Sequence, residues 1–328
     1  MKKCNIAILG ATGAVGRVMI QVMEERNIPV TSLKLLASER SEGMQIPFQG
    51  ELLTVHKTEK NSFEGVDYVL GAVSSSQIRY WLPFIRKAGA VLVDNSSAYR
   101  LDDNVPLVVP QINPEDVMKH QGIIANPNCA TIIALMAVNA INKLSPIRSM
   151  VVSTYQAVSG AGAKGTAELE KQIHQIAEGK EVSVEAFSEQ IAGNLIPQIG
   201  DFDAMGFSSE EMKLQNEGRK ILHNPDLKVS CTCVRVPVMR CHSESIMVLT
   251  ENRLDLDEVR KAICKEEGVI LNEPYPTPLA CSDKDQIQVG RIRQDLCFDN
   301  GIDLWCCGDQ LRKGAATNAV EILQQLLR

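Results

Sequence analysis

Residues 4–16 read CNIAILGATGAVG and decide the fold of the first part of the chain. The apolar run at 4–9 predicts a short buried strand, and the glycines after it predict a tight turn. Beyond the turn, apolar residues recur at helical spacing, namely Val15, Val18, Met19, Val22 and Met23. A strand, a glycine turn and a helix in this order are typical of the first β–α connection in a sheet that binds a dinucleotide.

The glycines Gly10, Gly13 and Gly16 have the spacing GxxGxxG. Glycines allow a phosphate to approach the backbone N–H groups at the positive end of a helix. The same spacing also fits a plain strand-to-helix turn. Its place at the first such connection of an alternating pattern favours the cofactor interpretation.

Strand-like and helix-like segments alternate through the first third of the chain. Strands are predicted at 32–38, 66–73, 90–96 and 105–113, with a helix over 76–88. This alternation predicts a parallel sheet with crossover helices, which is a Rossmann-type α/β domain.

After Thr131 the pattern changes. Helices are predicted over 132–143 and 166–179, and strands at 149–158, 228–238, 243–252, 286–295 and 301–309. Period-2 strands with few helices between them predict an antiparallel or mixed sheet with one covered face, in an α+β domain. The apolar stripe of the last helix, 315–327, needs a partner, for which the first domain is a candidate. We therefore expect one domain at 1–128 plus 311–328 and another at 129–310.

The composition is that of an ordinary globular protein of 328 residues, with 45% hydrophobic and 23% charged residues. A net charge of -6 disfavours a nucleic-acid partner or an anionic membrane surface. No run has membrane-spanning length and the N-terminus lacks a signal-peptide pattern, so we expect a cytoplasmic protein. The ten cysteines show no pair of CxxC units, which favours packed side chains over disulfides or a metal site. Cys231 and Cys233 fall on one face of a predicted strand.

The loop at 37–41, ASERS, bears on the choice of cofactor. An acidic side chain after the second strand binds the ribose of NAD, whereas an arginine accommodates the 2′-phosphate of NADP. Glu39 and Arg40 are both present, and Glu39 opposes a phosphate unless it is turned away. Glu39 also fits a solvated polar loop. Arg40 with flanking serines favours NADP.

Cys129 follows the turn Asn126-Pro127-Asn128 and precedes an apolar, helix-like run. A thiol at a helix N-terminus gains thiolate character, which suits a nucleophile. Buried cysteines are commoner as core residues, but an Asn-Pro-Asn turn is a poor place to bury one. Of the five histidines, His242 shares a short stretch with two arginines where two strands meet. It is the candidate partner for Cys129, although a hydrogen-bonded turn histidine remains the alternative.

Seven motifs extend these observations. In chain order they are GATGAVG, DNSSAYR, NPNCAT, STYQAVSGAG, EEMK, RVPVMRCHSES and GDQLRKGAA, and together they span Gly10 to Ala316. This set closely resembles the bacterial aspartate-β-semialdehyde dehydrogenases. The resemblance implies reversible, NADP-dependent conversion of aspartate semialdehyde and phosphate into β-aspartyl phosphate. It also implies a role in lysine, methionine, threonine and diaminopimelate biosynthesis, and a catalytic and dimerisation domain at 129–310 in a homodimer.

The resemblance also implies roles for individual residues. Cys129 corresponds to the nucleophile that forms the thioester, His242 to the acid/base, and Gln156 to the glutamine that orients the substrate. Arg235 corresponds to the arginine that binds the substrate carboxylate, and Glu210 to the partner of its ammonium group. Arg100 and Lys213 correspond to the phosphate-binding pair. The implied cofactor contacts are Gly10, Thr12, Gly13, Ala14, Val15, Arg40, Ser41, Ser159, Gly160 and Gln310.

One departure from the family pattern is Ala130, where many relatives carry a hydroxyl residue. An acyl-phosphate reductase for an N-acetylated substrate shares the Cys–His chemistry, but Arg235 and Glu210 favour a free amino acid. A dinucleotide-binding regulator without catalysis is a third possibility, against which Cys129, Gln156 and His242 argue.

Overall fold

The computed structural model describes residues 3–328, which form two compact units. The first unit runs up to Asn128 and resumes at Ala315–Arg328, and the second is Cys129–Gly314. The chain therefore passes between the units at 128/129 and at 314/315, the latter beyond the expected 310/311. The second unit is an insertion in the first.

A seven-stranded sheet forms the first unit, in the order β3-β4-β2-β1-β5-β6-β7. Its parallel strands are β1 (Cys4–Leu9), β2 (Val30–Ala37), β4 (Glu51–Lys57), β5 (Tyr68–Gly71), β6 (Val91–Asp94) and β7 (Ile123–Ala125). Only β3 (Gln45–Phe48), at the edge, runs antiparallel. The predicted Rossmann-type parallel sheet is confirmed.

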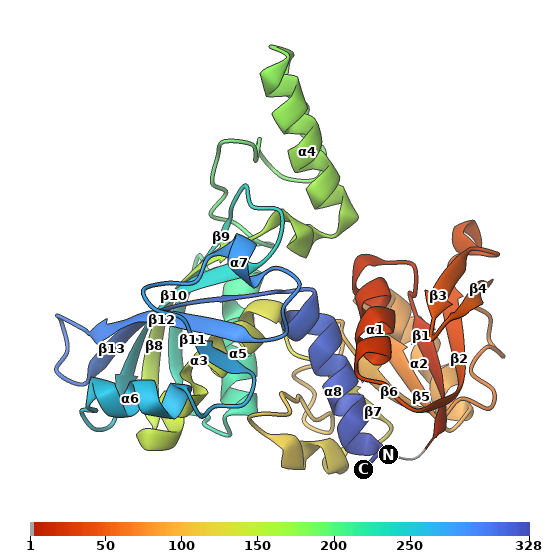
Figure 1. Ribbon diagram of the computed structural model, residues 1–328, viewed down its shortest axis with the longest axis horizontal. Helices are drawn as coiled ribbons and strands as arrows, with labels where there is room; N and C mark the ends of the chain where they lie inside the picture. Colours follow the sequence, from red (N-terminus) through yellow and green to blue (C-terminus); the bar gives the residue numbers. More distant parts are fainter. Residues whose placement is uncertain (1–2) are drawn as a thin grey trace. The chain divides into compact units, whose positions relative to one another are not determined.

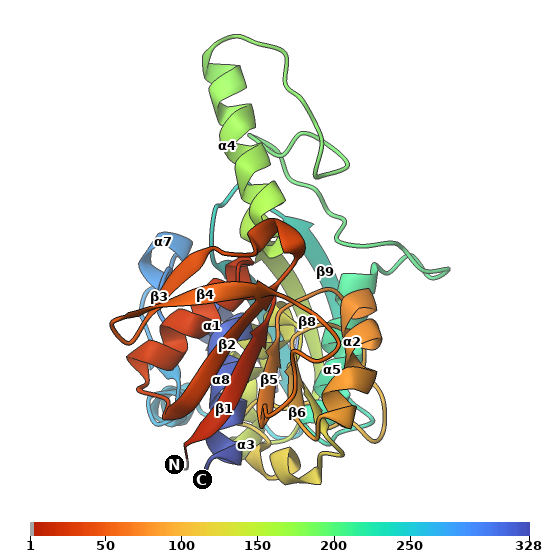
Figure 2. The same ribbon diagram turned by 90° about the vertical axis from the view of Figure 1, so that its right-hand side faces the viewer.

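Helices cover both faces of this sheet. From β1 the chain passes through α1 (Ala14–Glu25) to β2, and from β5 through α2 (Ser75–Lys87) to β6. Because these two crossovers move in opposite directions across the sheet, right-handed connections place α1 and α2 on opposite faces, as Figure 2 shows. The last helix, α8 (Thr317–Leu326), packs beside α1, so the first domain is the apolar partner that its sequence requires.

The strand predicted at 105–113 is wrong. This segment forms a single bridge, Leu107 to Ala125, followed by turns and the short helix η2 (Pro114–Lys119). Pro106 and Pro110 have no N–H to donate, so a continuous ladder cannot form there.

The second unit contains a six-stranded sheet in the order β11-β12-β13-β10-β8-β9. Its strands are β8 (Ile147–Gln156), β9 (Lys228–Arg235), β10 (His242–Thr250), β11 (Val269–Leu271), β12 (Ile287–Gln294) and β13 (Gly301–Gly308). Two neighbouring pairs are parallel, β8 with β9 and β11 with β12, and the other pairs are antiparallel. The mixed sheet is as predicted.

One face of this sheet is covered by α3 (Cys129–Leu144), α5 (Ser209–Ile221) and α6 (Leu256–Ile263). Cys231 and Cys233 are buried on the covered face, so they are packed side chains as predicted. On the opposite face, Val151 and Tyr155 of β8 are 49% and 37% exposed. Exposed apolar side chains that share one face of a strand mark a surface that a partner can cover.

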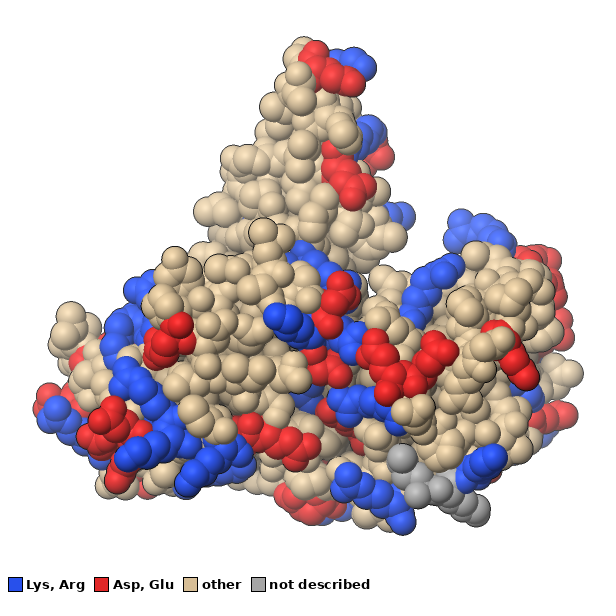
Figure 3. Space-filling model, in the orientation of Figure 1, with Lys and Arg blue, Asp and Glu red and all other residues tan. Residues whose placement is uncertain are grey.

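A long helix, α4 (Ala163–Ala177), projects from the body of the second unit, as Figure 1 shows. The smaller elements are η1 (Glu39–Ser41), η3 (Val158–Ala161), α7 (Pro278–Cys281) and η4 (Arg312–Ala316). Over the described residues, no helix combines the length and apolar character needed to cross a membrane. On the face drawn in Figure 3, acidic and basic side chains are interspersed over much of the surface, and basic side chains gather at the lower left, over the second unit near α6.

Candidate active site

Cys129 is the first residue of α3, so its thiol lies at a helix N-terminus, as the sequence predicts. The helix is fixed by packing, because every position of 130–141 is buried. Partial positive charge at the helix N-terminus favours the thiolate form. Cys129 itself is only partly buried, so a substrate can reach the sulfur.

His242 lies directly against this sulfur. The distance from Cys129 Sγ to His242 Nε2 is 3.3 Å, and the other ring nitrogen, Nδ1, accepts a hydrogen bond from the N–H of Ala157 at 3.1 Å. The ring is completely buried. Burial, and then the neighbouring positive charge of Arg235, lowers the pKa of His242 to about 3, whereas Glu210 opposes this shift. The imidazole is therefore neutral at physiological pH.

Three polar side chains lie in one row across the covered face of the sheet. Gln156, at the end of β8, pairs with Arg235, at the end of β9. His242 begins β10 and directly precedes Ser243, which pairs with Tyr155 of β8. The ends of three strands thus bring together residues that are far apart in the sequence. The row ends at Cys129 on α3.

α5 contributes a carboxylate to this row. Ser208 and Glu211 form a capping box that fixes the start of the helix. The carboxylate of Glu210 accepts a hydrogen bond from Gln156 Nε2 at 3.1 Å and pairs with Lys213 Nζ at 2.7 Å. Glu210 is 7% exposed. A carboxylate and an amide with fixed orientation can bind an ammonium group.

Arg235 supplies the opposite charge. Its Nη1 donates to the carbonyl of Ala157 at 2.7 Å, and the residue is 6% exposed. Burial lowers the pKa of the guanidinium, and nearby Cys129 and Glu210 oppose that shift. A cation held by a neutral carbonyl retains the capacity to bind a substrate carboxylate through its other nitrogens.

The two residues of the implied phosphate pair lie in different units. Lys213 is engaged by Glu210 in the second unit. Arg100 belongs to the first unit, where it is 7% exposed and donates to the carbonyls of Asn95 and Asn126 at 2.8 and 2.9 Å. The structure therefore does not group these two residues within one unit.

The glycine turn of the first unit is as tight as its sequence predicts. Gly10 has a φ of +91°, and a Cβ on it would lie 2.4 Å from the carbonyl oxygen of Ala72, just after β5. A Cβ on Gly16 would lie 2.2 Å from the oxygen of Gly10. Strand order reverses between β1 and β5, so the turn lies at the switch point where doubly wound sheets bind ligands.

In the loop at 37–41, Glu39 and Arg40 have different surroundings. Lys57 pairs with Glu39 at 3.0 Å, so the carboxylate is turned toward a cation on β4. Arg40 is exposed beside Ser41, whose hydroxyl is 3.2 Å from that of Thr12 in the glycine turn. Ala14 and Val15 begin α1, whose N-cap Gly13 offers no side-chain cap.

The remaining predicted cofactor residues adjoin the Cys129–His242 pair within the second unit. Gln310 donates to the hydroxyl of Ser159 and accepts from the N–H of Cys241 at 2.8 Å. A Cβ on Gly160 would lie 3.2 Å from His242 Cε1.

Two groups near the sulfur do not follow from the sequence. One is the N–H of Ala157, which fixes the ring of His242. The other is Gly314 in the π-helical turn η4, where a Cβ would lie 3.0 Å from the Cβ of Cys129. The motif GDQLRKGAA contains Gly314 and is the only sequence signal for it. The N–H of Ala157 belongs to the backbone, so no residue type in the sequence indicates its role.

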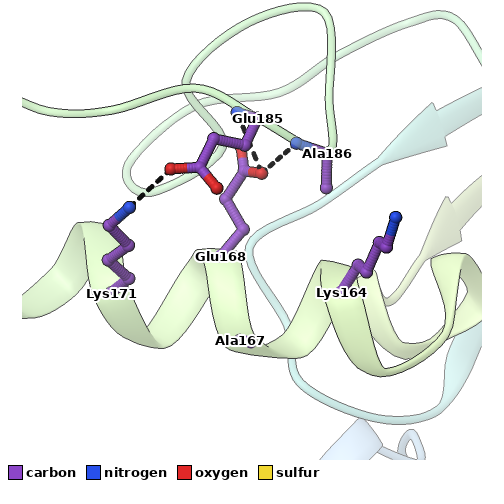
Figure 4. A pocket seen from close by; sticks show the side chains of 6 residues that line it. All are labelled: Lys164, Ala167, Glu168, Lys171, Glu185 and Ala186. Carbon is purple, nitrogen blue, oxygen red and sulfur yellow. Dashed lines mark hydrogen bonds and ion pairs between the residues drawn. The ribbon is translucent and has the colours of Figure 1, made fainter. Parts of the chain in front are cut away.

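A cavity of about 430 Å³ opens along α4, and none of the site residues predicted from the sequence lines it. In Figure 4, Lys171 pairs with Glu185 at 2.6 Å, and the carboxylate of Glu168 accepts from the backbone N–H groups of Glu185 and Ala186. These contacts hold the loop after α4 against the helix.

The two units place this chain in the semialdehyde dehydrogenase class of oxidoreductases, whose family models describe an NAD binding domain and a dimerisation domain. Family models support this class over most of the chain. The NAD binding domain of semialdehyde dehydrogenases matches residues 5–120, and the semialdehyde dehydrogenase dimerisation domain matches residues 138–313.

Comparison with individual relatives shows to which family within this class the chain belongs. The chain is 48% identical to the aspartate-semialdehyde dehydrogenase of Aquifex aeolicus, over 99% of this chain and 98% of that one. The Bacillus subtilis enzyme is 42% identical, over 98% and 97%. The crystal structure of aspartate semialdehyde dehydrogenase II from Vibrio cholerae, complexed with ASA, superposes with a TM-score of 0.98 at 41% identity, covering 100% and 99%. This chain belongs to the aspartate-semialdehyde dehydrogenase family.

Proposed function

We propose that this chain is the phosphorylating, NADP-dependent enzyme that reversibly converts aspartate 4-semialdehyde and phosphate into 4-aspartyl phosphate through a thioester on Cys129. The observation that carries the proposal is the 3.3 Å contact between Cys129 Sγ and His242 Nε2 at the N-terminus of α3. A relative with a TM-score of 0.98 carries ASA, which supports the same substrate class here.

The substrate is an amino acid with an ammonium group, a carboxylate and an aldehyde, and each finds a matching group. Arg235 binds the carboxylate as a planar fork. Glu210 binds the ammonium, with Gln156 orienting the substrate beside it. These contacts place the aldehyde carbon at Cys129 Sγ. An N-acetylated substrate has no ammonium for Glu210, so we expect little turnover of the N-acetyl γ-semialdehyde.

Cys129 and His242 perform the covalent chemistry. The thiolate adds to the carbonyl carbon, and the carbonyl oxygen becomes an oxyanion within reach of His242. In the oxidative direction a thioester results, which phosphate cleaves by displacing the thiolate of Cys129. Arg100 and Lys213 are the cations we assign to phosphate. Separate cations for the substrate carboxylate and for phosphate would prevent the two anions from exchanging places.

The residues of the first unit fit a dinucleotide. Gly10 and Gly16 leave no room for side chains, and the uncapped N-terminus of α1 offers its N–H groups to a pyrophosphate. Arg40 and Ser41 suit the 2′-phosphate of NADP, since Glu39 is engaged by Lys57. NADP, when bound, supplies or accepts the hydride. Ser159, Gly160 and Gln310 are its proposed contacts in the second unit.

The central test is phosphate-dependent NADPH formation with aspartate 4-semialdehyde. Wild-type protein should turn over, and Cys129→Ala should abolish turnover while NADP still binds, as measured by calorimetry. Cys264→Ala, which removes an exposed thiol on another element, is the matched control and should be unaffected. Inactive wild-type protein that still binds NADP would favour a regulator, and an active Cys129→Ala would exclude the thioester.

Cofactor choice has its own test. Arg40→Ala should raise the KM for NADP by about tenfold to a hundredfold, because a hydrogen bond to a charged group contributes about 1.5–3 kcal/mol. The KM for NAD should change little. Lys87→Ala, which removes a cation from the end of α2, is the control. An equal effect on both cofactors would show that Arg40 does not contact the 2′-phosphate.

A further inference from the structure

The side-chain amide of Gln156 has one orientation in the site. Its Nε2 donates a hydrogen bond to a carboxylate oxygen of Glu210 at 3.1 Å. A carboxylate has no proton to donate, so the nitrogen of the amide, and not its oxygen, must face Glu210. The amide oxygen, Oε1, accepts a hydrogen bond from the hydroxyl of Thr154 at 3.0 Å. The two ends of the amide are therefore held by different partners.

Thr154 lies in the interior of the sheet, next to the proposed substrate-binding residues. It precedes Gln156 by two positions on β8, so both side chains lie on the covered face. Thr154 is completely buried and Gln156 is 1% exposed. In the neighbouring strands, Thr154 pairs with Glu244 of β10 and with Cys233 of β9, and both of these residues are buried. The hydroxyl of Thr154 thus makes its hydrogen bond away from solvent.

The surroundings of Thr154 direct its hydroxyl to Gln156. A threonine is branched at Cβ, so its hydroxyl can take few directions. Neither carboxyl oxygen of the adjacent Glu244 has a hydrogen-bond partner among the described residues, so the Thr154 hydroxyl does not bond to that acid. Without the hydroxyl, Oε1 of Gln156 would lose this bond at a buried position, where an unmade hydrogen bond is costly.

The hydrogen bonds continue from Gln156 to α5. One carboxylate oxygen of Glu210 accepts from Gln156, and the other pairs with Lys213 Nζ at 2.7 Å. A chain of hydrogen bonds thus runs from Thr154 through Gln156 to Glu210. After these bonds, the Gln156 amide still has one N–H and one lone pair of Oε1 with which it can contact a substrate.

We propose that Thr154 is a positioning residue for the substrate: its hydroxyl holds the Gln156 amide, and through it the Glu210 carboxylate, in the orientation that receives aspartate 4-semialdehyde. This inference rests on the proposed function, in which Gln156 orients the substrate and Glu210 binds its ammonium group. Thr154 acts through Gln156 and does not contact the substrate itself.

Two substitutions at 154 separate the hydroxyl from the shape of the side chain. Thr154→Val keeps the shape without the hydroxyl, whereas Thr154→Ser keeps the hydroxyl. We expect Thr154→Val to lower kcat/KM for aspartate 4-semialdehyde by about fivefold to a hundredfold, because a buried acceptor loses its partner. Thr154→Ser should retain most of the activity. The KM for NADP should be unchanged in both variants, since Thr154 is not among the proposed cofactor contacts.

Thr250→Val is the matched control. It removes another completely buried hydroxyl from the same sheet, at the end of β10, where the hydroxyl donates to the carbonyls of Asn252 and Asn300. Thermal unfolding measures any loss of stability in each variant. Thr250→Val should leave kcat/KM unchanged. An equal loss of kcat/KM in the two valine variants, or a Thr154→Ser as impaired as Thr154→Val, would overturn the proposal.

A double-mutant cycle tests whether Thr154 acts through Gln156. Thr154→Val should cause no further loss of kcat/KM in a Gln156→Ala protein, because the amide on which Thr154 acts is already gone. Losses that multiply as if the two sites were independent would show that Thr154 acts by another route, and would reject the proposal.

The orientation of the amide can also be measured without turnover. In ¹⁵N NMR of glutamine-labelled protein, the Gln156 side-chain signals are assigned by their loss in Gln156→Ala. We expect their protons to exchange slowly with solvent in wild-type protein and in Thr154→Ser, and faster in Thr154→Val. Unchanged exchange in Thr154→Val would contradict the proposal. If wild-type protein fails to turn over aspartate 4-semialdehyde, the proposed function fails, while this measurement still decides whether Thr154 holds the amide.

Discussion

At the scale of single residues, the site depends on close approach as much as on chemical type. Gly314 lies in the π-helical turn η4, and a Cβ there would come within 3.0 Å of the Cβ of Cys129. π-Helical turns often occur at functional positions. Here the turn brings the backbone of Gly314 against Cys129, so a side chain at 314 has no room unless Cys129 shifts.

Gly314→Ala should therefore impair catalysis by moving the thiol. Overpacking of this kind costs about 1–3 kcal/mol, and a small misplacement of a reacting group costs up to about a hundredfold in rate. Gly218→Ala adds the same methyl in α5, where its nearest neighbour would be Leu227 at an ordinary 3.4 Å. Kinetics and thermal unfolding of both variants check this. Unchanged kcat in Gly314→Ala would show that Cys129 tolerates the displacement.

At the scale of elements, the type of most helices and strands follows from periodicity. The glycine turn and helix start at 10–16, and the position of Cys129 at the N-terminus of α3, are local features, because glycine conformation and helix ends depend on neighbouring residues. By contrast, α5 was not predicted as a helix, since its sequence, SEEMKLQNEGRKI, is polar over most of its length. The helix α5 instead forms through its packing against β9 and α3.

The row of Arg235, Gln156 and His242 also lay beyond what sequence alone predicts. Each residue ends or begins a strand, but their proximity depends on strand order and register, which join segments far apart in the chain. Periodicity predicts on which face of the sheet a side chain lies, but it does not predict which residue lies beside it in the next strand. The family resemblance supplied their roles, and the sheet supplies their proximity.

Next to this row, β10 carries a buried acid. Glu244 is completely buried, and neither of its carboxyl oxygens has a hydrogen-bond partner. Burial, followed by Cys233 and Glu210, raises its pKa well above the ordinary value. The folded state therefore keeps a proton that the unfolded chain loses above about pH 4.3, so the free energy of unfolding falls as the pH rises.

Glu244→Gln should remove this dependence while preserving shape. Above the pKa of the unfolded glutamate, the free energy of unfolding of wild-type protein should fall relative to the variant by about 1.4 kcal/mol per pH unit. At lower pH the difference should become constant. Urea unfolding of both proteins at several pH values measures it. A variant whose advantage shrinks with rising pH would contradict a protonated Glu244.

At the scale of the whole molecule, the second sheet has an exposed surface around β8 on the face opposite α3, whereas α7 packs against β13. Val151 and Tyr155 are exposed there, and the matching family model describes residues 138–313 as a dimerisation domain. A homodimer that covers this face is the assembly we expect from the family resemblance.

Val151→Asp should then dissociate the dimer. Burying an unpaired carboxylate costs about 3–5 kcal/mol, which raises the dissociation constant by more than about a hundredfold. Leu52→Asp, at a residue of β4 that is 62% exposed, is the control and should leave the assembly intact. Analytical ultracentrifugation distinguishes the two species. Dimers of unchanged affinity in Val151→Asp would place the interface elsewhere.

The inserted second unit begins at Cys129 and ends at Gly314, and these two ends lie against each other. A domain whose two ends lie close together can be exchanged as one unit, because a short connection is enough to join the two flanking segments of the chain. Cys129, the proposed nucleophile, is the first residue of the second unit, and the residues that we propose to bind the substrate also lie within this unit. Exchange of residues 129–314 between relatives would therefore transfer the proposed catalytic and substrate-binding residues together and leave the first unit unchanged.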